Sequence, residues 1–388
     1  MQFSHSEEQL AIREAARAFL AEHASSARVR AALALPDGYD RTLWQQMAGE
    51  LGWAGLAIPE RCGGAGLGWV ELCILEEEQG RQLVASPFFS TVALAASLVR
   101  AAGSEAQCQD LLGRIAAGTT QIACALTGAD GHAGVEGVTV ELRPAARGGF
   151  VLEGTSDFVI HAGSADLLLV LARAPGSRGG SGLSIAVIPA DAPGLTVTAH
   201  VMLDLTRPMS SVRFAGVAVA ADALLGPAGA AGPAIETALQ RAQIALAAEA
   251  LGGAERVLEM TVEYVKQREQ FGRAVGSFQA IKHRLADMMV QVEAARSASW
   301  YAACVADEQE AELAEAAAIA KSYCCDAFYD CAASAIQLHG GIGFTWEHDV
   351  HLYFKRARAT ATLLGSPAWQ RERLVRVLGL GAAAVPVF

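Results

Sequence analysis

The chain has 388 residues, of which 52% are hydrophobic and 18% are charged, and its formal net charge at pH 7 is −11. This composition predicts a folded protein with a large buried interior and excludes a disordered chain, while the length predicts two or three domains. Because the basic residues form no runs, we expect no nucleic-acid partner.

Residues 1–120 are expected to form an N-terminal all-α domain. Ser4 or Ser6 can cap a first helix, with Glu7 and Glu8 in its first turn, where carboxylates complement the helix dipole. The glycine-rich segment 59–68 does not fit the G-x-G-x-x-G dinucleotide fingerprint, so we interpret it as a loop before another helix.

The character of the chain changes in residues 121–228, which predict a middle β domain. Short β-branched runs are separated by Gly, Pro, Asp or Ser, which is typical of antiparallel strands. The predicted strands cover residues 138–142, 150–152, 167–171, 183–188 and 195–198. Residues 229–388 return to long helical patterns and predict a C-terminal helical bundle domain, so the order is α, β, α.

The sequence lacks three features that would indicate secretion, a membrane or a metal site. The first residues lack the basic region and the apolar core of a signal peptide. No stretch reaches the roughly 18 uninterrupted apolar residues of a membrane span. The eight cysteines lack metal-ligand spacing. We therefore expect a cytoplasmic protein with reduced, mostly buried thiols, no metal and no membrane partner.

The junction at residues 268–279 is the most informative passage. A long apolar-periodic stretch ends at Arg268, breaks at Phe271 and Gly272, and resumes after Phe278. A guanidinium for phosphate oxygens, amides for polar edges and a ring for a flat surface could hold an anionic cofactor here. From the spacing alone, a helical hairpin with solvated polar ends fits equally well.

A second glycine cluster occupies residues 337–343, directly after a helical run. Its three glycines leave backbone N–H groups accessible and allow a phosphate to approach closely. An ordinary helix stop needs only one of them. The surplus, with Gln337 and His339 alongside, favours a binding role.

With these motifs the chain resembles the acyl-CoA dehydrogenase family over essentially its whole length. Residues 51–68 resemble the family's N-terminal signature, residues 268–279 its flavin-binding signature, and residues 337–343 the glycine loop over the diphosphate. The resemblance implies a helical N-terminal domain, an antiparallel β-barrel-like middle domain and a C-terminal four-helix bundle. It also implies a homo- or hetero-oligomer, a dimer or tetramer, with FAD shared between subunits.

The resemblance also implies the flavin contacts. The isoalloxazine would lie against Leu126, Thr127, Phe158 and Ile160. Ile160 replaces a hydroxyl residue that usually reaches the flavin N5, which would alter the tuning of the flavin. The adenine and diphosphate side, much of it from the neighbouring subunit, would involve Arg268, Gln270, Phe271, Gln279, Gln337, Leu338, Gly340 and Gly341.

The implied reaction is α,β-desaturation of an acyl-CoA thioester, with electrons passed to an electron-transferring flavoprotein. A carboxylate in an apolar pocket would take the α-proton. The two family positions for this base correspond here to Leu364 and Ala242, and neither is a carboxylate.

Glu249 is the nearest carboxylate on the helix of Ala242. Seven residues separate the two, so Glu249 lies about 20° round the axis and roughly 10 Å further along. Glu249 is either a displaced catalytic base or a structural carboxylate that pairs with a buried arginine or caps a neighbouring helix. Both interpretations stay open on the sequence.

Several functions fit this pattern. The chain can be an acyl-CoA dehydrogenase active alone on a bulky or atypical acyl group. Residues 363–373 resemble a bacterial subgroup that includes enzymes of sterol side-chain and dicarboxylate degradation, several of which are α2β2 assemblies with one subunit that lacks the base. The chain can therefore be such a base-lacking partner subunit. A flavin monooxygenase or oxidase on the same fold also fits, as does a helical scaffold without cofactor.

Overall fold

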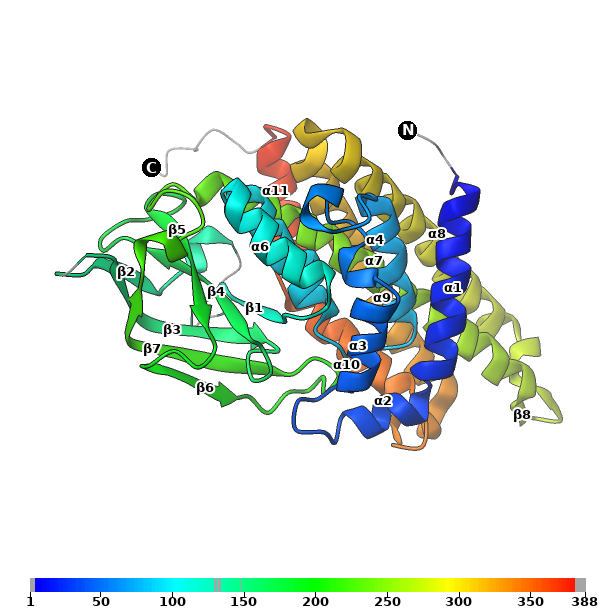
Figure 1. Cartoon of the computed structure of the whole chain (residues 1–388). Coiled ribbons are helices and arrows are strands. Elements are labelled where there is room, and N and C mark those ends of the chain that lie inside the picture. Colours follow the sequence, from blue (N-terminus) through cyan, green and yellow to red (C-terminus); the bar gives the residue numbers. More distant parts are fainter. Residues whose placement is uncertain (1–3, 129–130, 132–133, 147, 381–388) are drawn as a thin grey trace, which may run out of the picture.

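In the computed structural model, a curled sheet lies at one end of a body of packed helices (Figure 1). The structure describes residues 4–128, 131, 134–146 and 148–380. The helices come from both ends of the chain and the sheet from its middle. The predicted fold class, with helical, β and helical parts in this order, is confirmed.

The N-terminal part is helical up to Ala116. The Ser6 hydroxyl accepts a hydrogen bond from the Gln9 backbone N–H, and the Gln9 side chain accepts one from the Ser6 N–H, so a capping box starts the first helix as predicted. The main helices are α1 (Glu7–His23), α2 (Ser26–Ala32), α3 (Arg41–Gln45), α4 (Trp69–Arg81), the π-helical η4 (Phe89–Ala95), α5 (Ala96–Ala102) and α6 (Glu105–Ala116).

The middle part is a seven-stranded sheet in the order β1-β4-β2-β3-β7-β6, with β5 paired to β4. The strands are β1 (Ile122–Ala125), β2 (Glu141–Pro144), β3 (Phe150–Ile160), β4 (Leu167–Arg173), β5 (Leu183–Pro189), β6 (Leu195–Ala199) and β7 (Met209–Val219). The predicted antiparallel pattern holds for four of the pairings, but β4 runs parallel to β1 and β2, so the sheet is mixed. The alternation of apolar and polar residues along a strand shows which face is buried. It does not show whether the neighbouring strand runs parallel or antiparallel.

Long helices make up the C-terminal part. Helix α7 (Gly232–Gln267) leads to the hairpin of β8 (Glu269–Gln270) and β9 (Arg273–Ala274), which projects from the end of the molecule away from the sheet (Figure 1). The other elements are α8 (Gln279–Glu308), α9 (Leu313–His339), the 3-10 turn η9 (Gly340–Phe344), α10 (Val350–Thr362) and α11 (Pro367–Val377). The predicted domain boundaries fall between α6 and β1 and between β7 and α7.

Helices α4 and α7 cross at very short distance through two glycines. A Cβ added to Gly252 of α7 would lie 1.8 Å from the Glu77 carbonyl oxygen, and one added to Gly80 of α4 would lie 2.0 Å from the Glu249 carbonyl oxygen. Neither carbonyl can retreat without moving its helix. The two glycines therefore fix how the N-terminal and C-terminal helices pack.

Gly252→Ala is expected to destabilise the protein by about 1–3 kcal/mol or more, because the added methyl group forces the two helices apart. The free energy of unfolding from urea titration measures the effect. Gly113→Ala is the matched control, since a Cβ there lies 3.4 Å from the nearest atom, the Cys62 carbonyl oxygen. Equal free energies of unfolding for the two variants would contradict the close crossing.

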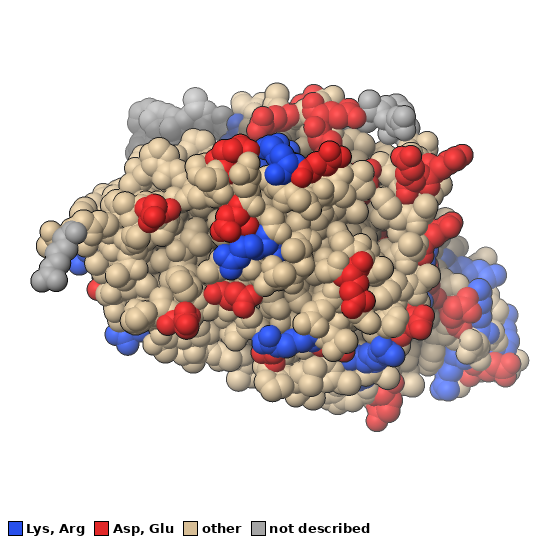
Figure 2. Space-filling view, viewed as in Figure 1, with Lys and Arg blue, Asp and Glu red and all other residues tan. Residues whose placement is uncertain are grey.

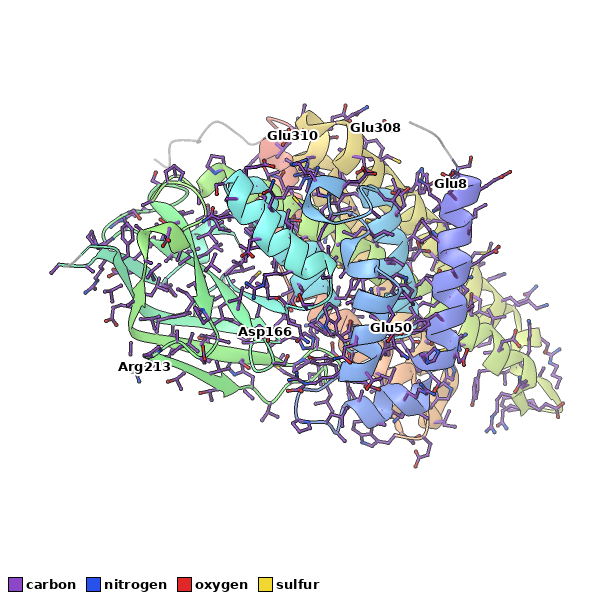
Figure 3. All side chains as sticks on the ribbon, viewed as in Figure 1. Glu8, Glu50, Asp166, Arg213, Glu308 and Glu310 are labelled. Carbon is purple, nitrogen blue, oxygen red and sulfur yellow. The ribbon has the colours of Figure 1, made fainter. Side chains whose placement is uncertain are left out.

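Charged side chains are mostly on the outside. Figure 3 places the labelled Glu8, Glu308, Glu310 and Arg213 at the surface. On the face shown in Figure 2, the acidic and basic residues are scattered, and basic ones gather at the end that carries β8. Exposed cations there are Lys266, Arg268, Arg273, Lys282 and Arg284.

The cysteines agree with the prediction of buried thiols. All eight are free and buried, and all lie in the described part of the chain. Among the residues that the structure describes, no group of His, Cys, Asp or Glu is arranged to hold a metal ion. Within the same residues, no helix combines the length and the apolar character that crossing a membrane requires.

Candidate active site

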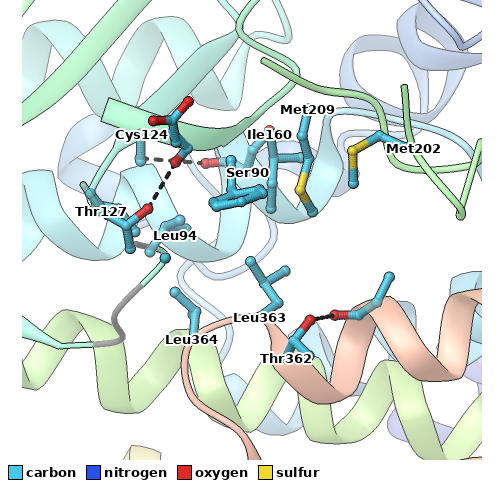
Figure 4. Close-up of a pocket in the computed structure, with 15 residues that line it drawn as sticks. Ser90, Leu94, Cys124, Thr127, Ile160, Met202, Met209, Thr362, Leu363 and Leu364 are labelled. Carbon is cyan, nitrogen blue, oxygen red and sulfur yellow. Dashed lines mark hydrogen bonds between the residues drawn. The ribbon is translucent and has the colours of Figure 1, made fainter. Parts of the chain in front are cut away.

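A cavity of about 380 Å³ lies where the sheet meets the helices. Its walls come from η4, from β1, β3 and β7 with the loops beside them, and from the end of α10 (Figure 4). Most of the lining side chains are apolar. They include Leu94, Cys124, Met202, Met209 and Leu363, none of which the sequence singled out for the flavin site.

The four residues predicted to contact an isoalloxazine all line this cavity: Leu126, Thr127, Phe158 and Ile160. Thr127 is tied to β3 by its hydroxyl, which donates to the Asp157 carbonyl oxygen over 2.8 Å. The Ser156 hydroxyl donates in turn to the Thr127 carbonyl oxygen over 2.7 Å. These bonds hold the loop after β1 against β3, so the wall is preorganised.

The backbone around the cavity is strained. Phe158 and Leu364, which both line it, have φ values of +56° and +53°, and the neighbouring His161 has +54°. Bulky residues rarely adopt this left-handed conformation, and such strain concentrates at functional sites. At both cavity positions the fold thus holds a large apolar side chain in a costly conformation.

Leu364, at one expected position of the base, forms part of the cavity wall (Figure 4). Its carbonyl oxygen accepts hydrogen bonds from the Gln243 and Gln370 side-chain amides, both over 3.0 Å. Ala242, at the other expected position, is fully buried next to Gln243. The two positions therefore lie close together in the fold, and both carry apolar side chains.

Glu249 does not line the cavity. Its carboxylate is buried and forms ion pairs with Arg207 and Arg356, the latter with a distance of 2.8 Å between Oε1 and Nη1. Burial alone would raise the pKa of Glu249, but the two guanidinium groups together lower it below its usual value. This geometry is that of the structural carboxylate paired with a buried arginine, and a lowered pKa opposes service as a base near neutral pH.

Asp157 is the one carboxylic acid among the described residues that line the cavity. A carboxylate oxygen of Asp157 lies 3.3 Å from Nε2 of His200. This residue was not predicted from the sequence, although it directly precedes Phe158.

The second half of the predicted flavin site lies elsewhere. Arg268, Gln270, Phe271 and Gln279 are exposed on and beside the β8–β9 hairpin, at the opposite end of the molecule from the sheet (Figure 1). The Phe271 side chain is 92% exposed. A single copy of the chain does not bring these residues to the cavity.

The glycine loop lies at the same end of the helices as that hairpin. The Tyr264 hydroxyl, on the last turn of α7, donates to the His339 carbonyl oxygen over 3.2 Å, and the two rings stack with centroids 4.3 Å apart. Gly340 has a φ of +63°, and Gly340 and Gly341 are exposed with open space where a Cβ would lie. Gln337 is exposed as well, and Leu338 is half-buried.

Comparison with known proteins identifies the family. Residues 6–119 match the family model of the acyl-CoA dehydrogenase N-terminal domain, and residues 232–379 match that of the C-terminal domain. The chain belongs to the acyl-CoA dehydrogenase family. Membership of this family makes it an oxidoreductase that acts on acyl-CoA.

Individual relatives cover the whole length. Acyl-CoA dehydrogenase IpdE2 from Mycobacterium tuberculosis is 36% identical over 95% of this chain and 96% of its own. The structure of butyryl-CoA dehydrogenase from Megasphaera elsdenii superimposes with a TM-score of 0.90 at 29% identity, covering 97% of this chain and 100% of the other. A chain of the ChsE4–ChsE5 complex from M. tuberculosis gives a TM-score of 0.87 at 28% identity, covering 99% and 100%.

The cavity of this acyl-CoA dehydrogenase fits a flavin ring. Its walls are mostly apolar, it includes the aromatic Phe158, and its volume lies in the range of small-molecule sites. Among the described residues of its wall, hydroxyl and carboxyl side chains that could orient a flavin ring come from Ser90, Thr127, Asp157 and Thr362. The described residues of the cavity wall include no lysine or arginine that could bind a phosphate.

Proposed function

We propose that the chain takes part in FAD-dependent α,β-desaturation of an acyl-CoA thioester, with electrons passed to an electron-transferring flavoprotein. Leu126, Thr127, Phe158 and Ile160 would hold the isoalloxazine, and the cavity beside it would take the acyl group. When bound, FAD supplies the acceptor for the β-hydride. The mostly apolar walls exclude water, which protects the chemistry and raises the pKa of a carboxylate placed there.

The adenine and diphosphate side of FAD would be held between two chains. Arg268, Gln270, Phe271 and Gln279 are exposed in this chain, and they would serve a cavity in the neighbouring subunit. Gln337, Leu338, Gly340 and Gly341 would add backbone N–H groups to the same site. The exposed basic side chains at this end provide the positive charge that an otherwise acidic protein needs to bind a diphosphate.

We further propose that this chain is the base-lacking partner subunit of a hetero-oligomeric enzyme. The observation that carries the proposal is Leu364, an apolar side chain on the cavity wall at the place of the expected carboxylate. Ala242 cannot replace the missing carboxylate. The charge of the Glu249 carboxylate is balanced by two arginines, and this residue lies away from the cavity. Two of the similar structures, ChsE4–ChsE5 and Tcur3481–Tcur3483, are of pairs of different proteins.

Co-expression with a homologous chain tests this proposal. The chain purified alone is expected to show no ferrocenium-coupled turnover across a panel of acyl-CoAs, and the co-purified pair is expected to be active, because only the partner brings a base. Retained flavin absorbance in both samples is the control. Turnover by the lone chain at the rate of the pair would overturn the partner-subunit proposal, and Asp157→Asn and Glu249→Gln would then show which carboxylate acts.

A further inference from the structure

A second, much smaller cavity of about 10 Å³ lies deeper in the helices. Ile160 lines both cavities, and the adjacent residues Phe89 and Ser90 of η4 line the small and the large one respectively. The small cavity therefore lies behind one wall of the large one. Its volume is about that of one water-sized probe, which is room for a single oxygen atom.

Two polar side chains in this small cavity have unused hydrogen-bonding capacity. Glu76 and Gln79 lie one turn apart on α4, and they are 2% and 5% exposed. Within the described part of the chain, neither Oε1 of Glu76 nor Nε2 of Gln79 has a hydrogen-bond partner. The Gln79 Oε1 atom accepts from the Ser86 hydroxyl over 3.2 Å, so the unpaired part of this cavity-lining side chain is its amide N–H groups. An unpaired buried polar group destabilises a protein by about 1–3 kcal/mol. Two such groups side by side therefore indicate that a ligand or a water molecule binds between them.

The charges around the small cavity select the chemistry of that ligand. Arg207 and Arg356 are already paired with Glu249, and Arg356 also pairs with Asp204 at 3.0 Å. Two cations and two carboxylates therefore balance. Burial first, and then the nearby Glu249 carboxylate, raise the pKa of Glu76 well above its usual value, against the opposing effect of the arginines.

A neutral Glu76 carboxyl can both donate and accept a hydrogen bond, and the Gln79 amide can donate. A hydroxyl or keto oxygen satisfies both groups. A carboxylate ligand would add an uncompensated negative charge beside Glu249, which is unfavourable in a buried site.

We propose that Glu76 and Gln79 form a subsite that selects acyl groups carrying a neutral oxygen, a hydroxyl or a keto group, at the end remote from the thioester. This inference rests on the proposed function, since the acyl group must occupy the large cavity and reach past Ile160. In the absence of such an oxygen, one water molecule fills the place.

Binding of matched acyl-CoAs tests the subsite without requiring turnover. The probes are the six-, eight- and ten-carbon acyl-CoAs and their ω-hydroxy counterparts, titrated by calorimetry into the flavin-loaded assembly. At the chain length that reaches the small cavity, the hydroxyl is expected to tighten binding about tenfold or more. The double variant Glu76→Leu/Gln79→Leu is expected to abolish this preference, whereas Glu76→Gln, a neutral donor and acceptor, retains it.

Folding of the double variant is checked by its thermal transition, which is expected to stay close to that of the wild type, because the loss of the Ser86–Gln79 hydrogen bond is offset by the removal of two polar atoms that lack a protein partner. If wild type and double variant bind both series with the same ratio at every length, the cavity holds a structural water only and the subsite is wrong. If no acyl-CoA of either series binds, the proposed function itself is wrong and the subsite falls with it.

Discussion

Leu364→Glu is expected to give the lone chain a desaturase activity far above that of the wild-type lone chain. The side chain at this position lines the cavity, and its backbone is fixed by the amides of Gln243 and Gln370. A glutamate there would stand in mostly apolar surroundings, where desolvation raises its pKa toward the range of a useful base. A positioned general base contributes about 10²–10⁴-fold, so the rate of anaerobic flavin reduction by acyl-CoA should rise by at least about 100-fold.

Leu363→Glu is the matched control for this gain of function. Leu363 lines the same cavity, but it follows directly on α10 with an ordinary φ of −66°, so its side chain points differently from that of Leu364, whose φ is +53°. We expect no comparable rise in rate per bound flavin. Equal rates for the two variants, or none for Leu364→Glu with flavin retained, would contradict the assignment of position 364 as the place of the missing base.

The sequence predicted the large elements because their patterns are long. The helical, β and helical order, the cap at Ser6 and most strands follow from periodicity and turn residues. β1 and β7 were not predicted: the four residues of β1 are all buried and do not alternate, and Met209–Val219 mixes Ser, Arg and Gly with apolar residues. The parallel pairing of β4 was also missed, since strand direction depends on chain crossovers that local pattern does not encode.

The candidate site was predictable only in part, for a related reason. The motifs around Phe158 and Arg268 are local, and the resemblance indicated that two subunits share them. Side chains that are far apart in the sequence and meet only in the folded protein could not be recognised as a site from the sequence. Glu76 is one of three consecutive glutamates in the sequence, and only the structure shows that it lies near Glu249 and that its Oε1 has no hydrogen-bond partner among the described residues.

Glu249→Gln is expected to destabilise the protein by about 3–5 kcal/mol, because among the described residues it leaves the buried Arg207 without an ion-pair partner and the buried Arg356 with Asp204 alone. The urea dependence of unfolding measures this loss. Glu236→Gln on the same helix is the matched control: Glu236 pairs with Arg373 at 2.7 Å, but its side chain is 42% exposed. Such a partly solvated pair is worth about 0–1 kcal/mol.

The pH dependence of the Glu249 variant separates a structural carboxylate from a displaced base. Although burial acts to raise it, the pKa of Glu249 in the folded protein is lowered from 4.5 by Arg207 and Arg356. The carboxylate therefore stabilises the fold fully above about pH 4.5, and this stabilisation is lost as the pH falls below that value. The difference in unfolding free energy between wild type and Glu249→Gln should accordingly be large at pH 7 and shrink toward acid pH. A variant that matches the wild type in stability at pH 7, keeps its flavin and yet abolishes turnover of the assembled enzyme would instead identify Glu249 as the base.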